Sequence, residues 1–298
     1  MVEEEYGKFT EVMARFIAYS AKHLPDDVAD RLAQMRAEED SPMAKAFYDA
    51  MDQNLRLADE LDRPCCQDTG VLQFYVRAGT RFPLLDGLSD CLVQAVKLAT
   101  AAAPLRHNVV EVFDEKNTGN NVGTRIPWIE WEPVPGSDSA EICLYMAGGG
   151  CSLPGAAKVL PPIGGYENAV KFVFDRIATL GVNACPPLLV GVGFGGSADV
   201  AAKLSKLALL RPVGSRNPNP RAAQLEEMLE TGLNGLGIGP GGVTGKRSVM
   251  GVNIEQAGRH TATLAVGLST ACWSHRRSRI RFGPDLRYEI LSFRGAVL

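Results

Sequence analysis

Beyond Arg63-Pro64 the chain alternates strand-like runs with amphipathic segments, and this alternation restricts the possible folds more than any other feature. Short apolar runs rich in β-branched residues predict strands, at 71–76, 141–146, 188–194 and 263–268. Apolar residues at helical spacing predict helices, at 166–180 and 198–210. Gly- and Pro-rich joints follow several of these elements. The sequence therefore predicts a mixed α/β fold over residues 63–298.

The first 62 residues predict helices instead. One apolar stripe has helical spacing and consists of Phe9, Val12, Met13, Phe16 and Ile17. Ser41 followed by Pro42 is typical of a cap and first turn, and predicts a helix that runs to about Leu61. Neither a linker composition nor an internal repeat occurs, so we expect one domain over residues 1–298, helical over 1–62.

Composition and charge exclude several classes of protein. Hydrophobic residues make up 46% and charged residues 22%, as in ordinary globular proteins. The net charge of -3 argues against nucleic-acid binding. No apolar run reaches the roughly 18 residues of a membrane span, and the acidic start MVEEEYGKF is unlike a signal peptide. Seven cysteines, an odd count, are typical of a reducing compartment, so we expect a cytoplasmic protein.

The run GVGFGG at 191–196 fits the G-x-G-x-x-G pattern of dinucleotide sites. The acidic residue expected about 20 positions later is missing, and the motif lies late in the chain. Close packing of a helix on a strand explains these glycines better than a nucleotide site does. Neither a zinc signature nor a G-x-S-x-G serine motif is present.

Three cysteines are distinguished by their context. Cys66 opens CQDTG, Cys185 opens CPP, and Cys272 follows the strand-like run LAVGLSTA. Backbone amides in such turns can point at sulfur and stabilise a cluster. The spacing alone leaves open whether these cysteines are ligands or buried thiols.

Charged residues near these cysteines suit a dicarboxylate substrate. Asp68 follows Cys66 by two positions and is a candidate proton donor or acceptor. Arg106 and His107 lie in PLRHN, and Arg276 and Arg277 follow Cys272. Arginine forks grip carboxylates in two places at once. The alternative is that these residues, Arg277 and Arg279 in particular, are solvated surface charges.

Several segments together resemble the class I, iron–sulfur-dependent fumarase and tartrate dehydratase family. They are RPCCQDTG at 63–70, RFPLL at 81–85, APLRHN at 103–108, NTGNNVG at 117–123, YMAGGGCSLPG at 145–155, VNACPPLLVGVG at 182–193 and CWSHRR at 272–277. The resemblance covers nearly the whole chain. The forms GGGCSLPG and CWSHRR favour the tartrate-type alpha subunits over single-chain fumarases, and the fold implied is that of the fumarase N-terminal domain.

The resemblance implies a site residue by residue. Cys66, Cys185 and Cys272 match the three cluster ligands of the family. Gln67, Asp68, Arg106 and Gly149 match positions that contact substrate, and His107 is expected to bind substrate beside Arg106. Asp68 and Arg106 are the expected catalytic residues: Asp68 would exchange a proton with the leaving hydroxyl, and Arg106 would hold the developing carboxylate charge. Cys151 lies in a glycine loop expected to approach the substrate, and its role stays open.

The implied cofactor is a [4Fe-4S] cluster with three cysteine ligands and one open iron. Electron-transfer clusters usually have four thiolates, whereas an open iron can act as a Lewis acid without redox change. The implied reaction is the dehydration of L-tartrate to oxaloacetate. The resemblance implies a beta subunit and an α₂β₂ heterotetramer, because the family's other acid–base group lies in a C-terminal domain absent here. The alternatives are a two-subunit fumarase acting on malate and fumarate, a non-catalytic iron–sulfur protein, and a subunit without metal.

Overall fold

The computed structural model describes residues 2–298. Its first part consists of three helices, α1 (Val2–Lys22), α2 (Asp26–Glu38) and α3 (Pro42–Glu60). The Ser41 hydroxyl accepts a hydrogen bond of 3.4 Å from the Ala44 backbone N–H, as a helix cap does. The predicted helical N-terminal portion, with its cap at Ser41, is confirmed.

The chain divides into two compact units, each built from separate stretches of sequence. Unit 1 contains residues 1–26, 53–148 and 276–298, and unit 2 contains residues 27–52 and 149–275. The chain therefore passes four times from one unit to the other. The expectation of one domain over residues 1–298 stays a prediction, and the units are described separately below.

Unit 1 contains a five-stranded sheet in the order β11-β10-β5-β1-β4. Only β1 and β4 pair in parallel; the other neighbours are antiparallel. The strands are β1 (Val71–Gly79), β4 (Trp128–Val134), β5 (Ala140–Ala147), β10 (Arg277–Phe282) and β11 (Tyr288–Ile290). The predicted strands at 71–76 and 141–146 are confirmed as β1 and β5.

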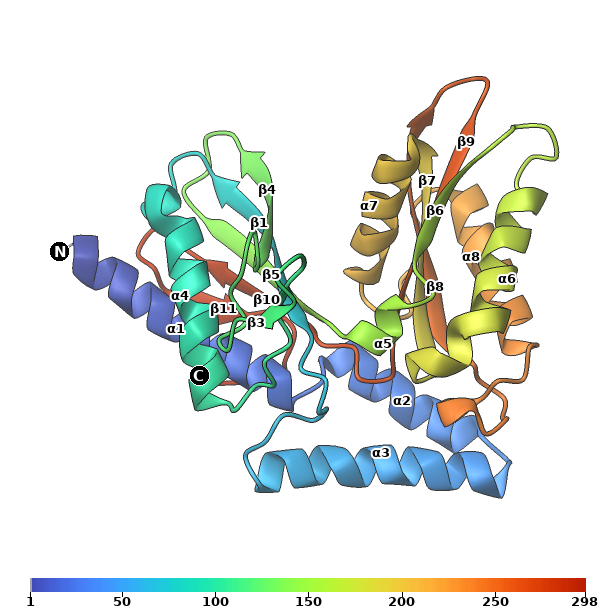
Figure 1. Ribbon diagram of the computed structural model, residues 1–298, viewed down its shortest axis with the longest axis horizontal. Coiled ribbons are helices and arrows are strands. Elements are labelled where there is room, and N and C mark those ends of the chain that lie inside the picture. Colours follow the sequence, from blue (N-terminus) through green and yellow to red (C-terminus); the bar gives the residue numbers. More distant parts are fainter. Residues whose placement is uncertain (1) are drawn as a thin grey trace. The chain divides into compact units, whose positions relative to one another are not determined.

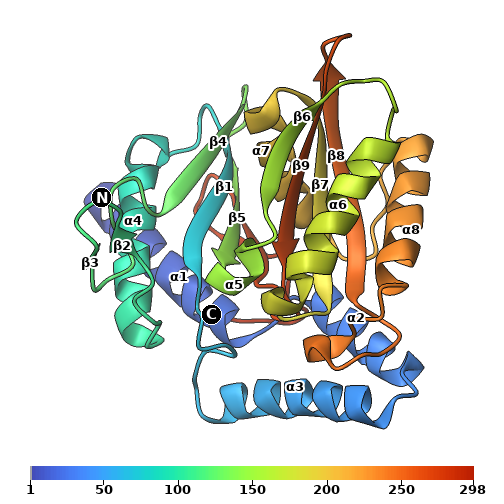
Figure 2. The same ribbon diagram turned by 45° about the vertical axis from the view of Figure 1, so that its right-hand side comes forward.

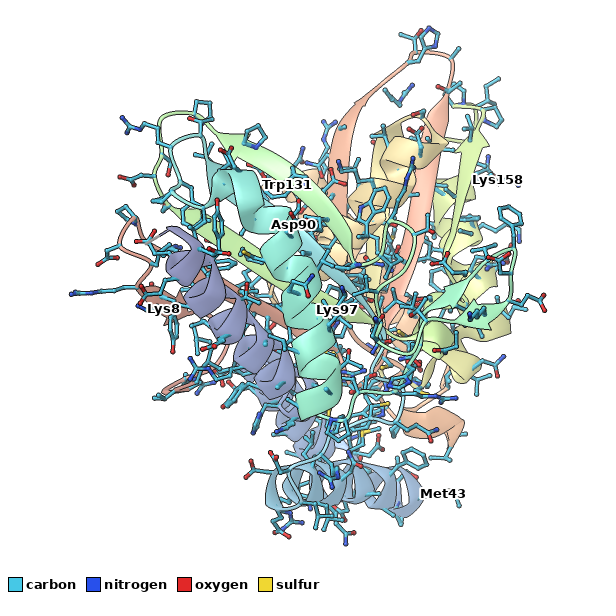
Figure 3. All side chains as sticks on the ribbon, turned by 60° about the vertical axis from the view of Figure 1, so that its left-hand side comes forward. Lys8, Met43, Asp90, Lys97, Trp131 and Lys158 are labelled. Atoms are coloured by element: carbon cyan, nitrogen blue, oxygen red, sulfur yellow. The ribbon has the colours of Figure 1, made fainter. Side chains whose placement is uncertain are left out.

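Two helices of unit 1, α1 and α4 (Leu88–Ala102), pack together against this sheet. Every second side chain of β1 enters the core: Leu72, Phe74 and Val76 are buried among the apolar residues of both helices. Figure 3 labels polar residues on these helices, Lys8 on α1 and Asp90 and Lys97 on α4. The short helix η1 (Leu85–Gly87) precedes α4, and a separate two-stranded ribbon consists of β2 (Val110–Glu111) and β3 (Lys116–Asn117).

Unit 2 contains a four-stranded sheet in the order β6-β9-β7-β8, in which only β7 and β8 are parallel. Helix α7 lies on one face, and α6 and α8 lie on the other (Figures 1 and 2). The elements of this sandwich are β6 (Ala156–Leu160), α6 (Glu167–Leu180), β7 (Leu188–Gly196), α7 (Ala198–Leu209), α8 (Pro220–Asn234), β8 (Val249–Arg259) and β9 (Leu264–Ala271). The shorter helices are α5 (Gly149–Ser152), η2 (Gly181–Ala184) and η3 (Pro240–Gly242). The observed architecture confirms the predicted α/β fold class.

The glycines of GVGFGG let α7 lie close to β7. A Cβ on Gly191 would meet the Ser205 carbonyl oxygen at 2.2 Å, and one on Gly193 would meet the Ala201 carbonyl oxygen at 2.1 Å. A Cβ on Gly267 of β9 would likewise meet the Ala201 carbonyl oxygen, at 2.2 Å. The interpretation of the motif as helix–strand packing is therefore confirmed.

Among residues 2–298, none of the helices has both the length and the apolar character needed to cross a membrane.

Candidate active site

The CQDTG loop, residues 66–70, connects α3 to β1 in unit 1. Asp68 is half-buried, and its Oδ1 atom accepts hydrogen bonds from the Gly70 backbone N–H at 3.0 Å and from Asn108 Nδ2 at 3.3 Å. Gly70 has a φ of +78°, and a Cβ there would meet backbone atoms of Met146 at 2.8 Å. Only glycine fits this turn. The two hydrogen bonds hold the Asp68 carboxylate in one direction.

Asn108 connects three groups of the CQDTG loop. Its Nδ2 atom lies 3.3 Å from Asp68 Oδ1, 3.3 Å from Thr69 Oγ1 and 3.1 Å from the Gly70 carbonyl oxygen. Its backbone N–H donates to Asn121 Oδ1 at 2.8 Å. The sequence did not single out Asn108, although it lies in the APLRHN segment.

Arg106 and His107 follow α4 and present exposed side chains, while their backbone is held in place. The Arg106 carbonyl oxygen accepts from Asn121 Nδ2 at 3.0 Å and from Thr69 Oγ1 at 3.3 Å. The His107 carbonyl oxygen accepts from Asn117 Nδ2 at 2.8 Å. Unit 1 therefore brings the Arg106-His107 loop and the CQDTG loop together.

Asn121 is the centre of this network. It is fully buried, has a φ of +60°, and also donates to Thr100 Oγ1 on α4 at 3.1 Å. Asparagine adopts this left-handed conformation more easily than most residues do. A buried asparagine in the NTGNNVG segment was not predicted as part of the site, and only its place in that segment could have indicated it.

Arg276, far along the chain from the CQDTG loop, forms a hydrogen bond to that loop. It is 2% exposed, and its Nη2 atom donates to the Asp68 carbonyl oxygen at 2.6 Å. Its own carbonyl oxygen accepts from the Met146 backbone N–H at 3.1 Å. Arg277 is also buried, so the interpretation of Arg277 as a solvated surface charge is wrong. Arg279 is half-buried, and its Nη1 atom lies 3.6 Å from Glu141 Oε1.

The other two predicted ligands lie in unit 2. Cys185 ends η2 with a left-handed backbone (φ 55°, ψ 65°), and its side chain is exposed. Its carbonyl oxygen accepts from the Trp273 backbone N–H at 3.2 Å. Because Trp273 directly follows Cys272, this bond places the two cysteine segments side by side. Cys272 is half-buried.

The glycine loop lies beside the same segments of unit 2. Helix α5 begins at Gly149, which is exposed, and packs on β9 and η2. Cys151 is buried, and its carbonyl oxygen accepts a hydrogen bond from the Thr270 hydroxyl. Burial lowers the pKa of Lys206 on α7, an effect that the neighbouring Cys151 opposes. Lys206 was not predicted from the sequence.

The donor chemistry of the three predicted ligands suits an iron–sulfur cluster. None of the seven cysteines forms a disulfide, and Cys66, Cys185 and Cys272 are the ones that are half-buried or exposed. Thiolates are the usual ligands of such clusters. Within residues 2–298, no group of three or more His, Cys, Asp or Glu side chains is placed so that it could hold a metal ion. The ligand assignment therefore rests on the resemblance and stays a prediction.

Comparison with known proteins gives the family. The model of the fumarate hydratase (Fumerase) family matches residues 10–281. The chain belongs to the fumarate hydratase (Fumerase) family. The family resemblance predicted from the sequence motifs is confirmed, and so is the predicted class of enzyme, a hydro-lyase.

Relatives within this family are similar over nearly their whole length. The L(+)-tartrate dehydratase subunit alpha of Escherichia coli strain UTI89 is 56% identical over 97% of this chain and 96% of that protein. The protein of the same name from Escherichia coli K12 is 55% identical over the same shares, as is that from Shigella sonnei. The words "subunit alpha" say that those proteins act with another subunit.

Proposed function

We propose that this chain is the alpha subunit of an L(+)-tartrate dehydratase, which converts L-tartrate to oxaloacetate and water together with a beta subunit. The observation that carries the proposal is the 56% identity to alpha subunits of that name over 97% of the chain. The hydrogen-bond network around Asp68 supports it, because it orients a carboxylate beside an exposed arginine loop.

In this proposal Asp68 exchanges a proton with the leaving hydroxyl group. Two N–H donors hold Oδ1, and Arg276 holds the backbone of the same residue. A carboxylate fixed in this way loses little entropy when it meets the substrate. General acid–base catalysis by such a group typically contributes about 10²–10⁴-fold in rate.

Arg106 would bind a substrate carboxylate and stabilise the charge that develops on it as the neighbouring C–H proton leaves. The guanidinium is exposed, while the Arg106 carbonyl is held by Asn121 and Thr69. A charged, bidentate donor aimed at developing charge is an effective catalytic device. We propose that His107, Gln67 and Gly149 bind the remainder of the substrate.

The proposed cofactor is a [4Fe-4S] cluster held by Cys66, Cys185 and Cys272. When bound, such a cluster would supply Lewis-acid chemistry through an iron that lacks a protein ligand. The bond between Trp273 N–H and the Cys185 carbonyl supports the placement of two ligands in unit 2. We further propose an α₂β₂ assembly in the cytoplasm, where thiols stay reduced.

The second candidate function is that of a two-subunit fumarase acting on malate and fumarate. The description of the matching family, fumarate hydratase, favours it. Both functions use the same elimination chemistry on a four-carbon dicarboxylate, so a few substrate contacts decide between them.

The test is anoxic turnover of the chain copurified with its beta subunit, on L-tartrate and L-malate side by side. The proposal expects tartrate to be dehydrated much faster than malate. Faster conversion of malate and fumarate would replace it with the fumarase function. No turnover of either substrate by an iron-loaded complex would contradict both.

A further inference from the structure

The β2–β3 hairpin of unit 1 exposes apolar side chains, Val110 on β2 and Val112 and Phe113 in the turn between the strands. Phe113 is 98% exposed, Val112 is 80% exposed and Val110 is 47% exposed. Phe113 is the most exposed large hydrophobic residue in the part of the chain that the structure describes. Three such residues within four positions form an apolar surface patch, which commonly indicates a binding surface.

Hydrogen bonds brace this hairpin. Strand pairing joins Val110 to Asn117 and Glu111 to Lys116. Glu111 Oε1 accepts from the Thr124 backbone N–H at 2.8 Å. A rigid element loses little conformational entropy on binding, so its apolar area contributes more fully to affinity.

The base of the hairpin is continuous with the candidate site. Asn117, the last residue of β3, donates to the His107 carbonyl oxygen at 2.8 Å. Thr118 N–H donates to the Val109 carbonyl at 3.0 Å, which closes the hairpin directly after the Arg106-His107 loop. The base of the hairpin, where Val110 pairs with Asn117, therefore adjoins the Arg106-His107 loop.

Charge restricts what the tip can bind. Asp114 and Glu115 are exposed and directly follow Phe113, and Lys116 is the one cation between Val110 and Asn117. An apolar anchor beside two carboxylates fits an apolar pocket with a basic rim. A membrane surface is unfavourable for the same reason, because anionic headgroups repel carboxylates.

We propose that Val110, Val112 and Phe113 anchor the beta subunit, by inserting into an apolar pocket with a basic rim on that subunit. The hairpin would thereby bring beta-subunit residues beside Arg106 and His107. The identity of the partner rests on the proposed function, whereas the docking surface rests on exposure, bracing and charge.

The test measures the dissociation constant between purified alpha and beta subunits by titration in sedimentation velocity experiments. Phe113→Asp should raise the constant about tenfold or more, as loss of an aromatic anchor does. Ile163→Asp is the matched control, because Ile163 is 85% exposed but lies before α6 in unit 2. It should change the constant less than about twofold. Replacing both Asp114 and Glu115 by Lys should slow association, most strongly at low salt.

Two further measurements distinguish a docking defect from a folding defect and from a catalytic defect. The melting temperature of the Phe113→Asp alpha chain alone should equal that of the wild type, and excess beta subunit should restore its turnover. An unchanged dissociation constant for Phe113→Asp would overturn the inference, as would loss of alpha–alpha association in place of alpha–beta binding. Weakened binding in a complex that does not act on tartrate would support the docking surface and contradict only the proposed function.

Discussion

The orientation of Asp68 depends on residues far apart in the sequence. Asn108 lies 40 positions from Asp68, and Arg276 lies 208 positions away. The roles of Cys66, Asp68 and Arg106 are predictions from their residue types and motifs. The supporting bonds could not, because an isolated asparagine or arginine does not indicate which distant backbone group it will contact.

Replacement of Asp68 by Asn tests its proposed acid–base role. The amide keeps the shape of the side chain but cannot exchange the proton, so turnover should fall about 100-fold or more. Iron content and melting temperature should match the wild type. Asp86→Asn, at an exposed position in η1, is the control and should be fully active. Turnover above a tenth of the wild-type value would rule out the role.

Glu39 predicts a pH dependence of stability. Burial by itself raises the pKa of this carboxyl, but backbone N–H groups of Ser41, Lys246 and Asp40 outweigh it, so the pKa lies below its ordinary value of 4.5. A lowered pKa means that the carboxylate stabilises the fold above pH 4.5, and that this contribution is lost as the pH falls through the folded-state pKa.

Glu39→Gln should therefore lower the free energy of unfolding at pH 7 by about 1–3 kcal/mol, the cost of unsatisfied buried groups. The difference from the wild type should shrink as the pH falls below 4.5 and through the lowered folded-state pKa, as urea denaturation at each pH will show. Glu60→Gln, at an exposed position, serves as the control. A difference that stays constant with pH would contradict this account of Glu39.

At the scale of elements, segments with a clear apolar periodicity were predicted correctly. Segments in which charged and apolar residues are mixed were missed. The helices that have clear apolar stripes and the four predicted strands are confirmed. The sequence analysis did not predict β10, in which Arg277, Arg279 and Arg281 alternate with Ser278, Ile280 and Phe282. In the sheet the arginines occupy one face, while Ile280 and Phe282 enter the core. Helix α4 was also missed, although its buried residues have helical spacing.

Gly193→Ala tests the close packing of α7 on β7. The added methyl group would meet the Ala201 carbonyl oxygen at 2.1 Å, so the backbone must shift. The free energy of unfolding should fall by about 1–3 kcal/mol, as overpacked cores show. Gly251→Ala on β8 is the control: its nearest neighbour would lie 3.5 Å away, and the effect should be below about 1 kcal/mol. Similar losses for both variants would contradict this role of Gly193.

At the scale of the whole molecule, each unit collects distant stretches of sequence: Cys66 belongs to unit 1, and Cys185 and Cys272 belong to unit 2. Secondary-structure patterns could not predict this division, because each unit is assembled from separate stretches of chain. The motifs, in contrast, predict these three cysteines as ligands without knowledge of the units.

Serine in place of Cys66, Cys185 or Cys272 should each lower the iron and sulfide bound after anoxic reconstitution to less than about half of the wild-type amount, since a cluster needs all of its thiolates. Cys91→Ala, in the core of unit 1, is the control and should leave iron content unchanged. Full iron content in any of the three serine variants would remove that residue from the ligand set.

The interleaving of the units also sets an order of events during synthesis. A ribosome that has translated residue 275 has made every residue of unit 2, whereas unit 1 still lacks residues 276–298. The nascent sheet of unit 1 then has β5 as an open edge, because β10 is its missing neighbour. The CQDTG loop also lacks the Arg276 bond to Asp68. All residues of unit 2 are therefore made first, and the Arg276 bond to the loop that carries Asp68 can form only after residue 276 has been made.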